Sequence, residues 1–464
     1  MFLEMIEAEG LAHLSYVFGD EEAGVCAVVD PRRDIDAYLA AARRHRARIT
    51  AILETHIPSD FVSGSRELAA RTGAPLYVGA GEYGFAHRAL HGGESIPLGR
   101  LRVRVLAAPG HTPEHVCYVV TDGAAGGAPV CVFTGDTLLR GEVGRPEPAG
   151  VDAERLARAL YRTLHHALLL LGDDVVVYPG RGRRGRRGGR TDGGPETTIG
   201  DERRNNPRLA AATESEFVAA LLASTRPTPT HYARLRALNA RGPDVVGHLP
   251  NLPALDPHRL RAQIADGQVM VIDARGNEAY AGAHIAGALN LALRSPFPLW
   301  AGWLLDPARE IVLVVERPAD IETVRRHLYR IGHDAIGGRL RGGMHRWIEA
   351  GLPFRYTAPI SVHELRERIE DGEGRFQLVD VRCEDEWADG RIPGARNIPL
   401  PALVDRPDTL DRGRPVVVYA GAGYRASIAV GILERGGFQR VRIVPGGMLA
   451  WRAAGFPVER GAAS

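Results

Sequence analysis

The sequence has no lysine and only four cysteines, and both shortages exclude classes of chemistry. All 58 lysine-or-arginine positions are arginine, so the chain has neither a Schiff-base lysine nor the phosphate-binding lysine of a P-loop. The cysteines are scattered and form no CxxC pair: they are Cys26, Cys117, Cys131 and Cys383. This spacing argues against a disulfide framework and against a zinc site built from thiolates.

Long apolar runs and an excess of charge of one sign are also missing. No run approaches the roughly 20 apolar residues that span a bilayer, and the first nine residues lack the basic-then-apolar pattern of a signal peptide. The formal net charge is +2, which provides no general attraction to nucleic acid or to an anionic membrane. We therefore expect a cytoplasmic protein that binds neither nucleic acid nor membrane.

The first 245 residues alternate apolar runs of strand length with segments of helical periodicity. Residues 24–30 and 48–54 are such runs, and they enclose 34–46, where apolar residues recur at helical spacing. Stretches rich in proline and turn formers at 225–230 and 247–257 predict a linker. A chain of 464 residues is too long for one ordinary core. We expect three domains, at residues 1–245, 255–357 and 358–464.

The chain repeats itself after the linker. When Asp273 is aligned with Asp380, three motifs recur in the same order, which chance alone does not give. The paired segments are 271–275 with 379–382, 284–290 with 391–397, and 342–347 with 446–451. The sequence thus predicts two tandem domains of about a hundred residues each.

Two histidines and one aspartate in the first 245 residues stand where strand-like runs give way to loops. They are His56 in Thr-His-Ile-Pro, His111 in Pro-Gly-His-Thr and Asp136 in Thr-Gly-Asp-Thr. Catalytic groups often occupy such loops, and two imidazoles with one carboxylate form the facial triad of non-haem iron(II) oxygenases. A single histidine or aspartate in a loop is more often a surface or capping residue, so the prediction depends on the three occurring together.

These motifs, with others in the same order, resemble the metallo-β-lactamase superfamily and most closely its persulfide dioxygenase branch. The other motifs lie at 28–31, 60, 177–180 and 198–203. The resemblance implies an αββα sandwich and one Fe(2+) ion per chain held by His56, His111 and Asp136, with zinc as the alternative occupant. It also implies O2 and a small-molecule persulfide of the glutathione type as substrates.

In the two-metal relatives, further histidines hold a second metal ion, and here those positions are Pro58, Phe61 and Arg181. Proline and phenylalanine offer no ligand atom, and arginine stays protonated and repels a cation. A dinuclear zinc site is therefore disfavoured. Pro58 also restricts the backbone beside His56 and biases Ile57 toward an extended conformation. This restriction either keeps His56 in position to bind a metal ion or prevents it from doing so. Asp60 is a candidate acceptor for a ligand imidazole, and His115 is either a second supporting group or an ordinary strand residue.

An arginine-rich run follows at 181–190. One interpretation is a cationic rim that attracts the carboxylates of an anionic thiol, with Arg181, Arg183 and Arg184 as the substrate-binding residues. The other is an ordinary solvated loop. Nucleic-acid binding is disfavoured, because such binders usually combine aromatic side chains with a basic face.

Both repeats resemble rhodanese domains, the α/β fold of sulfurtransferases. Active members carry a nucleophilic cysteine after a strand, at the start of a loop whose backbone N–H groups stabilise the persulfide. The resemblance places Glu316 there in the first repeat and Ala420 in the second, and neither can carry sulfur. Glycines and Arg425 leave the second loop able to bind an anion. Three roles for the repeats therefore stay open: they bind an anion, they stabilise the chain, or they build a homodimer.

The expected fold is an α/β protein in which an αββα metallo-β-lactamase sandwich precedes two tandem rhodanese-like domains. The expected function is iron-dependent oxidation of a persulfide by O2 to sulfite and thiol, in sulfur metabolism. Two alternatives stay open. One is a metal-dependent thioester hydrolase of the hydroxyacylglutathione hydrolase type, and the other is a non-catalytic scaffold that binds sulfur compounds or anions.

Overall fold

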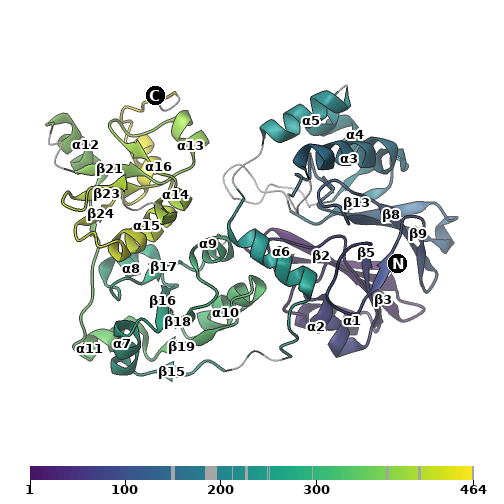
Figure 1. Ribbon diagram of the computed structural model, residues 1–464, viewed down its shortest axis with the longest axis horizontal. Coiled ribbons are helices and arrows are strands. Elements are labelled where there is room, and N and C mark those ends of the chain that lie inside the picture. The colour runs from purple at the N-terminus through teal and green to yellow at the C-terminus, as the bar shows by residue number, and fades with distance from the viewer. Residues whose placement is uncertain are drawn as a thin grey trace. The chain divides into compact units, whose positions relative to one another are not determined.

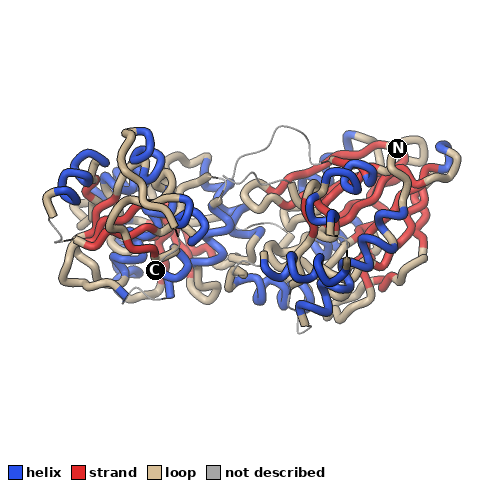
Figure 2. The backbone as a smooth tube through the Cα atoms, turned by 90° about the horizontal axis from the view of Figure 1, so that it is seen from above, coloured by secondary structure: helices blue, strands red, loops and turns tan. Residues whose placement is uncertain are grey.

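The chain divides into two units in this computed structural model. The first comprises Met1–Leu249 and Tyr329–Gly332, and the second Pro250–Leu328 and His333–Ser464. The course of the backbone and its helices and strands are drawn in Figures 1 and 2. The structure describes residues 1–147, 152–182, 196–211, 213–224, 228–247, 249, 251–294, 296–372, 376–405 and 409–461.

Two six-stranded sheets form the centre of the first unit. Their strand orders are β1-β2-β3-β4-β5-β6 and β14-β13-β10-β9-β8-β7. The strands of the first sheet are Phe2–Ala8 (β1), His13–Asp20 (β2), Val25–Val29 (β3), Arg48–Leu53 (β4), Leu76–Gly79 (β5) and Arg88–Leu90 (β6). Those of the second are Ser95–Leu98 (β7), Leu101–Ala107 (β8), Val116–Asp122 (β9), Pro129–Gly135 (β10), Val176–Pro179 (β13) and Thr197–Thr198 (β14). Leu138–Leu139 (β11) and Glu142–Val143 (β12) pair separately.

Alternation of side chains along the strands packs the two sheets face to face. In β2, Tyr16 and Phe18 lie in the core between the sheets, whereas Val17 belongs to the core on the outer side. In β9, Tyr118 likewise lies in the core between the sheets, whereas Val119 belongs to the core on the outer side of the second sheet. Helices cover both outer faces, which gives four layers (Figure 1). The expected αββα sandwich is confirmed.

The helices of this unit occupy two sides of the sheet pair. Asp36–Arg44 (α1) and Ser65–Thr72 (α2) pack on the first sheet, and Ala153–His166 (α3) and Glu214–Ala223 (α5) on the second. The remaining helices are Ile199–Asn205 (α4), His231–Arg241 (α6) and the 3-10 turns Gly123–Ala125, Leu168–Leu170 and Pro207–Ala210.

The second unit contains two five-stranded parallel sheets, one for each repeat. In the first repeat the strands are Ala254–Leu255 (β15), Val269–Asp273 (β16), Leu289–Asn290 (β17), Glu310–Val314 (β18) and Ile336–Leu340 (β19). Its helices are Pro257–Ala265 (α7), Asn277–Gly282 (α8), Phe297–Leu304 (α9), Asp320–Arg330 (α10) and Gly343–Glu349 (α11). In the second repeat the strands are Ala358–Pro359 (β20), Gln377–Asp380 (β21), Arg396–Asn397 (β22), Val416–Tyr419 (β23) and Val441–Ile443 (β24). Its helices are Val362–Glu370 (α12), Glu384–Asp389 (α13), Leu400–Asp405 (α14), Tyr424–Arg435 (α15) and Gly447–Ala453 (α16).

The two repeats share their strand order and their buried hydrogen bonds. Arg275 donates to the carboxylate of Asp273, and Arg382 does the same to Asp380. The other equivalent donors are Asn290 with Asn397, each bonded to two carbonyls, and Trp347 with Trp451, each bonded to the carbonyl six residues later. The register predicted from the sequence therefore recurs in the polar contacts.

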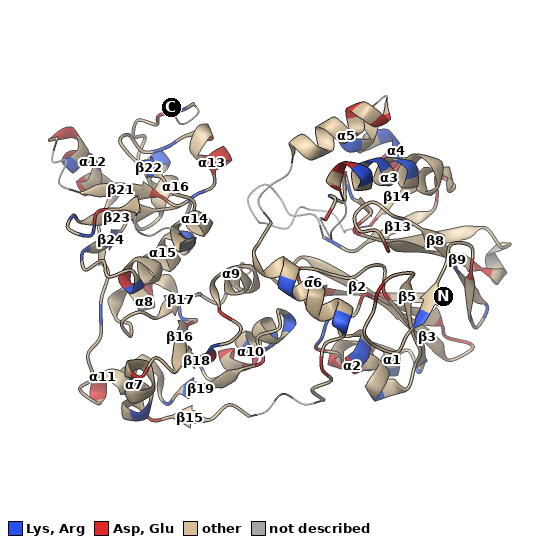
Figure 3. Cartoon of the chain, in the orientation of Figure 1, with Lys and Arg blue, Asp and Glu red and all other residues tan. Residues whose placement is uncertain are grey.

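Charged side chains of both signs are interspersed over the elements of each unit (Figure 3). Many form pairs on one helix, such as Arg158 with Glu154 on α3. No described helix combines the length and the apolar character needed to cross a membrane.

Candidate metal centre

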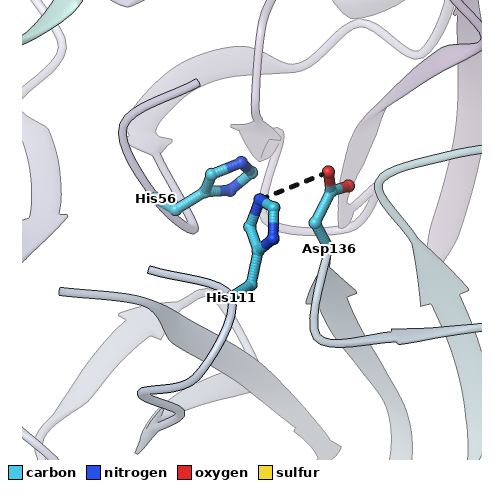
Figure 4. Close-up of side chains that lie close together, drawn as sticks. All are labelled: His56, His111 and Asp136. Carbon is cyan, nitrogen blue, oxygen red and sulfur yellow. Dashed lines mark ion pairs between the residues drawn. The ribbon is translucent and has the colours of Figure 1, made fainter. Parts of the chain in front are cut away.

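Three loops of the first unit bring His56, His111 and Asp136 together. His56 follows β4, His111 lies between β8 and β9, and Asp136 follows β10 directly. Each residue offers one ligand atom, and these atoms all lie within 4.8 Å of one another. All three residues are buried, and Figure 4 shows the two rings and the carboxylate approaching from separate loops. The arrangement predicted from the motifs is therefore present in space.

Glycine allows the backbone to pass close to these side chains. Gly135, at the end of β10, has φ +49°, and a Cβ there would lie 2.4 Å from Thr55 Oγ1 and 2.8 Å from His115 Nε2. A Cβ on Gly180 would lie 2.8 Å from Asp136 Oδ1. Larger residues at either position would displace the groups around the aspartate, which explains why the Thr-Gly-Asp and Tyr-Pro-Gly motifs need glycine.

His111 has one ring nitrogen engaged and one that faces acceptors. Its Nδ1 lies 2.6 Å from the carbonyl oxygen of Arg145, so Nδ1 carries the proton and donates it there. Its buried Nε2 has no hydrogen-bond partner among the described residues. Nε2 faces Asp136 Oδ2 at 3.6 Å and Glu147 Oε1 at 3.9 Å. The lone pair of Nε2 and the carboxylate oxygens repel one another, and a cation bound between them would stabilise this arrangement.

His56 is oriented by its neighbour in the sequence. The Thr55 hydroxyl donates to Asp30 Oδ2 at 2.8 Å and accepts from His56 Nδ1 at 2.9 Å. This leaves the Nε2 lone pair of His56 available to a metal ion. Burial, with the nearby ring of His111, lowers the pKa of His56 well below its usual value, so the imidazole stays neutral. The sequence suggested Asp60 as the supporting acceptor, but the structure gives that role to Thr55.

His115 supports the site without joining the three ligands. Its ring stacks on that of His56, with 4.9 Å between centroids and 13° between planes. Its Nε2 accepts from the backbone N–H of Asp136 at 3.3 Å, and the Thr137 hydroxyl lies 3.2 Å from its Nδ1. Burial, with the nearby rings of His56 and His111, lowers the pKa of His115, which keeps this ring neutral as well.

Arg181 lies inside the site rather than on a rim. Its Nε donates to Asp136 Oδ2 at 2.5 Å, and its Nη1 donates to Asp60 Oδ2 at 2.7 Å. Burial acts to raise the pKa of Asp136, but Arg181 and His111 outweigh burial and hold that pKa below its usual value. The guanidinium predicted to bind substrate therefore already has two carboxylate partners. Arg183 and Arg184 lie outside the described residues.

The charges around the site fit one divalent cation. Among the described residues, the carboxylates of Asp60 and Asp136 pair with the guanidinium of Arg181, and the carboxylate of Glu147 faces His111; this set of four groups has a formal charge of two minus. Ser59 Oγ donates to Glu147 Oε1 at 2.5 Å and holds this carboxylate beside the triad. Buried charge of this kind is costly unless it is balanced. The donor set and the charge thus agree with a single metal ion.

The positions that correspond to the rhodanese nucleophile carry no sulfur. Ala420 follows β23 and is buried, and Glu316 is exposed near the end of β18. Both Nη atoms of Arg425 donate to the Glu386 carboxylate, at 2.6 and 2.8 Å, which neutralises the cation predicted to bind an anion. Burial and a hydrogen bond to Glu386 raise the pKa of the Cys383 thiol, so this cysteine is no ready nucleophile.

Family models match most of the chain. The Metallo-beta-lactamase superfamily model matches residues 8–181, and the Rhodanese-like domain model matches 256–350 and 361–454. A protein named probable metallo-hydrolase, from Burkholderia pseudomallei (strain 1710b), is 30% identical over 248 residues, which cover 44% of this chain and 80% of that protein. The chain belongs to the metallo-β-lactamase superfamily. Two rhodanese-like domains follow this first domain, and the expected fusion is confirmed.

Two further likenesses bear on the architecture and on the branch of the superfamily. A metallo-beta-lactamase from Staphylococcus aureus subsp. aureus COL has a crystal structure that superposes with a TM-score of 0.66 at 28% identity, over 74% of this chain and 98% of that chain. The human mitochondrial persulfide dioxygenase ETHE1 is 29% identical over 210 residues, 44% of this chain and 74% of that protein. The chain spans only 56% to 61% of the length of the beta-lactamase hydrolase-like proteins that it also matches.

Proposed function

We propose that the first unit is a mononuclear iron enzyme that oxidises a low-molecular-weight persulfide of the glutathione type with O2. The observation that carries the proposal is the buried convergence of His56, His111 and Asp136. Two imidazoles and one carboxylate with open positions are the donor set of non-haem iron(II) oxygenases. The human relative is named a persulfide dioxygenase, and this supports the choice of substrate.

The proposed reaction balances without a further co-reactant. His56, His111 and Asp136 would hold the iron(II), which would supply open coordination positions for a persulfide and O2. One persulfide RSSH, one O2 and one water give one thiol RSH, one sulfite and two protons. The terminal sulfur loses four electrons, and O2 takes up all four. No side-chain base is needed to activate a persulfide that binds as its anion.

The residues around the triad prepare the ligands and limit the site to one ion. Thr55 and the Arg145 carbonyl fix the tautomers of His56 and His111, so that one nitrogen of each ring is a free donor to metal. The guanidinium of Arg181 places a fixed positive charge beside the third ligand, where it opposes the binding of a second cation.

Ring stacking occupies the position of Phe61. Phe61 stacks on His13 with ring centroids 3.9 Å apart, and both residues are buried. Burial of this kind beside the loop that carries His56 strengthens electrostatic interactions within the site.

Metal analysis combined with oxygen uptake tests the proposal. The protein purified without O2 and supplied with Fe(2+) should contain one iron per chain, and glutathione persulfide should yield one sulfite for each O2 consumed. His111→Ala should abolish both iron binding and O2 uptake. His91→Ala changes an exposed histidine outside the triad and should change neither. Folded wild-type protein that binds no iron, or that binds iron but consumes no O2, would refute the proposal.

The same measurements separate the two alternatives. Zinc in place of iron, with hydrolysis of a glutathione thioester, would identify a thioester hydrolase. The absence of any metal in folded protein would identify a non-catalytic scaffold. The ion pairs of Arg181 oppose the two-metal form of the hydrolase site, because they use the carboxylates of Asp60 and Asp136.

We also propose that the two rhodanese-like domains transfer no sulfur and serve to stabilise the second unit. Helix α15, which follows the inactive loop, packs against β17 of the first repeat through a hydrogen bond of 2.6 Å from Ser427 Oγ to Asn290 Oδ1. His284 Nε2 lies 3.1 Å from Glu434 Oε2 in the same contact. An assay with thiosulfate and cyanide should detect no turnover. A homodimer stays a prediction, which light scattering tests.

A further inference from the structure

The loop that joins His56 to α2 is buried along its whole length. Every residue from 51 to 65 is buried, including Pro58 and Phe61. Buried backbone N–H and C=O groups need hydrogen-bond partners. A loop with no regular structure cannot supply these partners from within, so other elements must hold it.

Asn239 of α6 supplies three of these partners through one side chain. Its Nδ2 donates to the carbonyl of Pro58 at 2.8 Å and to that of Phe61 at 2.7 Å. Its Oδ1 accepts from the backbone N–H of Ser63 at 2.9 Å. Asn239 is only 4% exposed. A single amide thus fixes the beginning, middle and end of the loop.

Arg236 holds the residue that directly follows the first ligand. Its Nη1 donates to the carbonyl of Ile57 at 3.1 Å, and its Nη2 pairs with the Glu114 carboxylate at 3.2 Å. Glu114 Oε1 in turn accepts from the backbone N–H of Ile57 at 3.0 Å. Both backbone groups of Ile57 are therefore bonded, and this restrains the direction in which His56 points.

The helix that carries these two side chains is itself anchored. Asn239 and Arg236 are three residues apart and so face the same side of α6. The carbonyl of Ala240 accepts from the N–H of Gly84 at 2.8 Å, and Arg66 Nη1 donates to the carbonyl of Pro243 just beyond the helix at 2.5 Å. The superfamily model ends at residue 181, so this support comes from a segment beyond the matched domain.

We propose that Asn239 and Arg236 are positioning residues that hold His56 in its ligand pose. They act through the backbone of residues 57–63. The part of this inference that concerns the metal rests on the proposed function, whereas the restraint of the loop does not. Pro58 is compatible with the site because its carbonyl, the one hydrogen-bonding group that proline retains, is bonded by Asn239.

Hydrogen exchange of the metal-free protein tests the restraint directly. In the wild type, the amides of Ile57 and Ser63, whose N–H groups are hydrogen-bonded, should exchange slowly. Asn239→Ala should speed exchange across the loop at least tenfold, and Asn239→Asp, which keeps one acceptor for Ser63, should speed it mainly at the earlier positions. Leu164→Ala is the matched control, since it opens a buried cavity on α3 against the other sheet and should leave loop exchange unchanged.

Cobalt(II) provides the second readout, because its visible absorption reports coordination geometry. Asn239→Ala should weaken Co(2+) binding about 10- to 100-fold, the range for groups that orient ligands, and should alter the absorption bands. Leu164→Ala should preserve the Co(2+) affinity and the absorption bands, even if its melting temperature falls as much as that of Asn239→Ala.

Three results would overturn the inference. They are fast exchange of the loop in the wild type, unchanged exchange in Asn239→Ala, and faster exchange with unchanged Co(2+) affinity and spectrum. Wild-type protein that bound no metal would instead refute the proposed function, and the exchange data would still decide whether the loop is restrained.

Discussion

Replacing Arg181 with glutamine should destabilise the first unit, because its guanidinium is the counter-ion of two buried carboxylates. Asp60 is 4% exposed and Asp136 is 5% exposed, and both lie within 2.7 Å of the guanidinium. Glutamine keeps part of the length of the side chain but leaves these carboxylates facing one another without a positive charge. The repulsion and the lost pairing act in the same direction.

The expected size follows from the burial of the pair. Removal of one partner from a buried ion pair costs about 3–5 kcal/mol. The Arg181 side chain is 27% exposed, so we expect about 3 kcal/mol, the lower end of this range. For a unit of this size, 1 kcal/mol shifts the melting temperature by about 2–4 °C, which predicts a decrease of about 6–12 °C.

Calorimetry combined with fluorescence assigns the change to the correct unit. All five tryptophans lie in the second unit, at positions 300, 303, 347, 387 and 451. Arg181→Gln should therefore lower the melting temperature of the first unit, which calorimetry detects. The transition of the second unit, which tryptophan fluorescence follows, should stay unchanged. Added Co(2+) should restore more stability to the variant than to the wild type, because the metal then has no guanidinium competing for Asp136.

The matched control is another arginine that bridges two carboxylates, but at the surface. Arg158 pairs with Glu154 and Glu214, and its side chain is 41% exposed. Exposed pairs contribute little to stability because water and salt screen them, so Arg158→Gln should have little effect. If Arg181→Gln cost no more than Arg158→Gln, the argument that Arg181 balances the buried charge of the site would be refuted.

Three other changes test separate parts of the structure. Thr55→Val removes the acceptor of His56 Nδ1 and should weaken Co(2+) binding about 10- to 100-fold in a competition titration; an unchanged affinity would contradict the assigned tautomer. Burial acts to raise the pKa of Glu386, but Arg425 lowers it to about 2, below its usual value of 4.5. This pair should therefore add about 1 kcal/mol above pH 4.5, after allowance for exposure, and that stability should vanish as the pH falls toward 2. Arg425→Gln should abolish this pH dependence when unfolding is followed by tryptophan fluorescence, and a retained dependence would point to other carboxylates. Ala420→Cys should acquire one sulfur atom from thiosulfate in mass spectrometry, since the loop and α15 still surround that position; an unmodified thiol would show that more than the nucleophile is lost.

The features that could be predicted from the sequence are those encoded within short segments. Strand alternation and the ends of strands located the ligand loops, and motifs a few residues long located His56, His111 and Asp136. The tandem repeat was predictable because its buried Asp–Arg pairs, such as Asp273 with Arg275, are two residues apart and recur with the fold. In each case the interacting residues are close in the sequence, so the sequence alone reveals the pattern.

The polar partners of the ligands were not predictable, because they depend on contacts between distant segments. Arg181 and Asp60 are 121 positions apart, and no local pattern pairs Asp60 with Arg181 rather than with His56. Asn239 is 181 positions from Pro58. The contact of Thr55 with Asp30 is more accessible to prediction, because Thr55 follows β4 and Asp30 follows the parallel neighbour β3.

The buried carboxylate of Asp60 is balanced by the cation that faces it. A buried carboxylate without a counter-charge is strongly destabilising. Arg181 supplies that charge within hydrogen-bonding distance of both Asp60 and Asp136. Arg181 therefore balances the buried charge of Asp60 beside the point where His56, His111 and Asp136 converge.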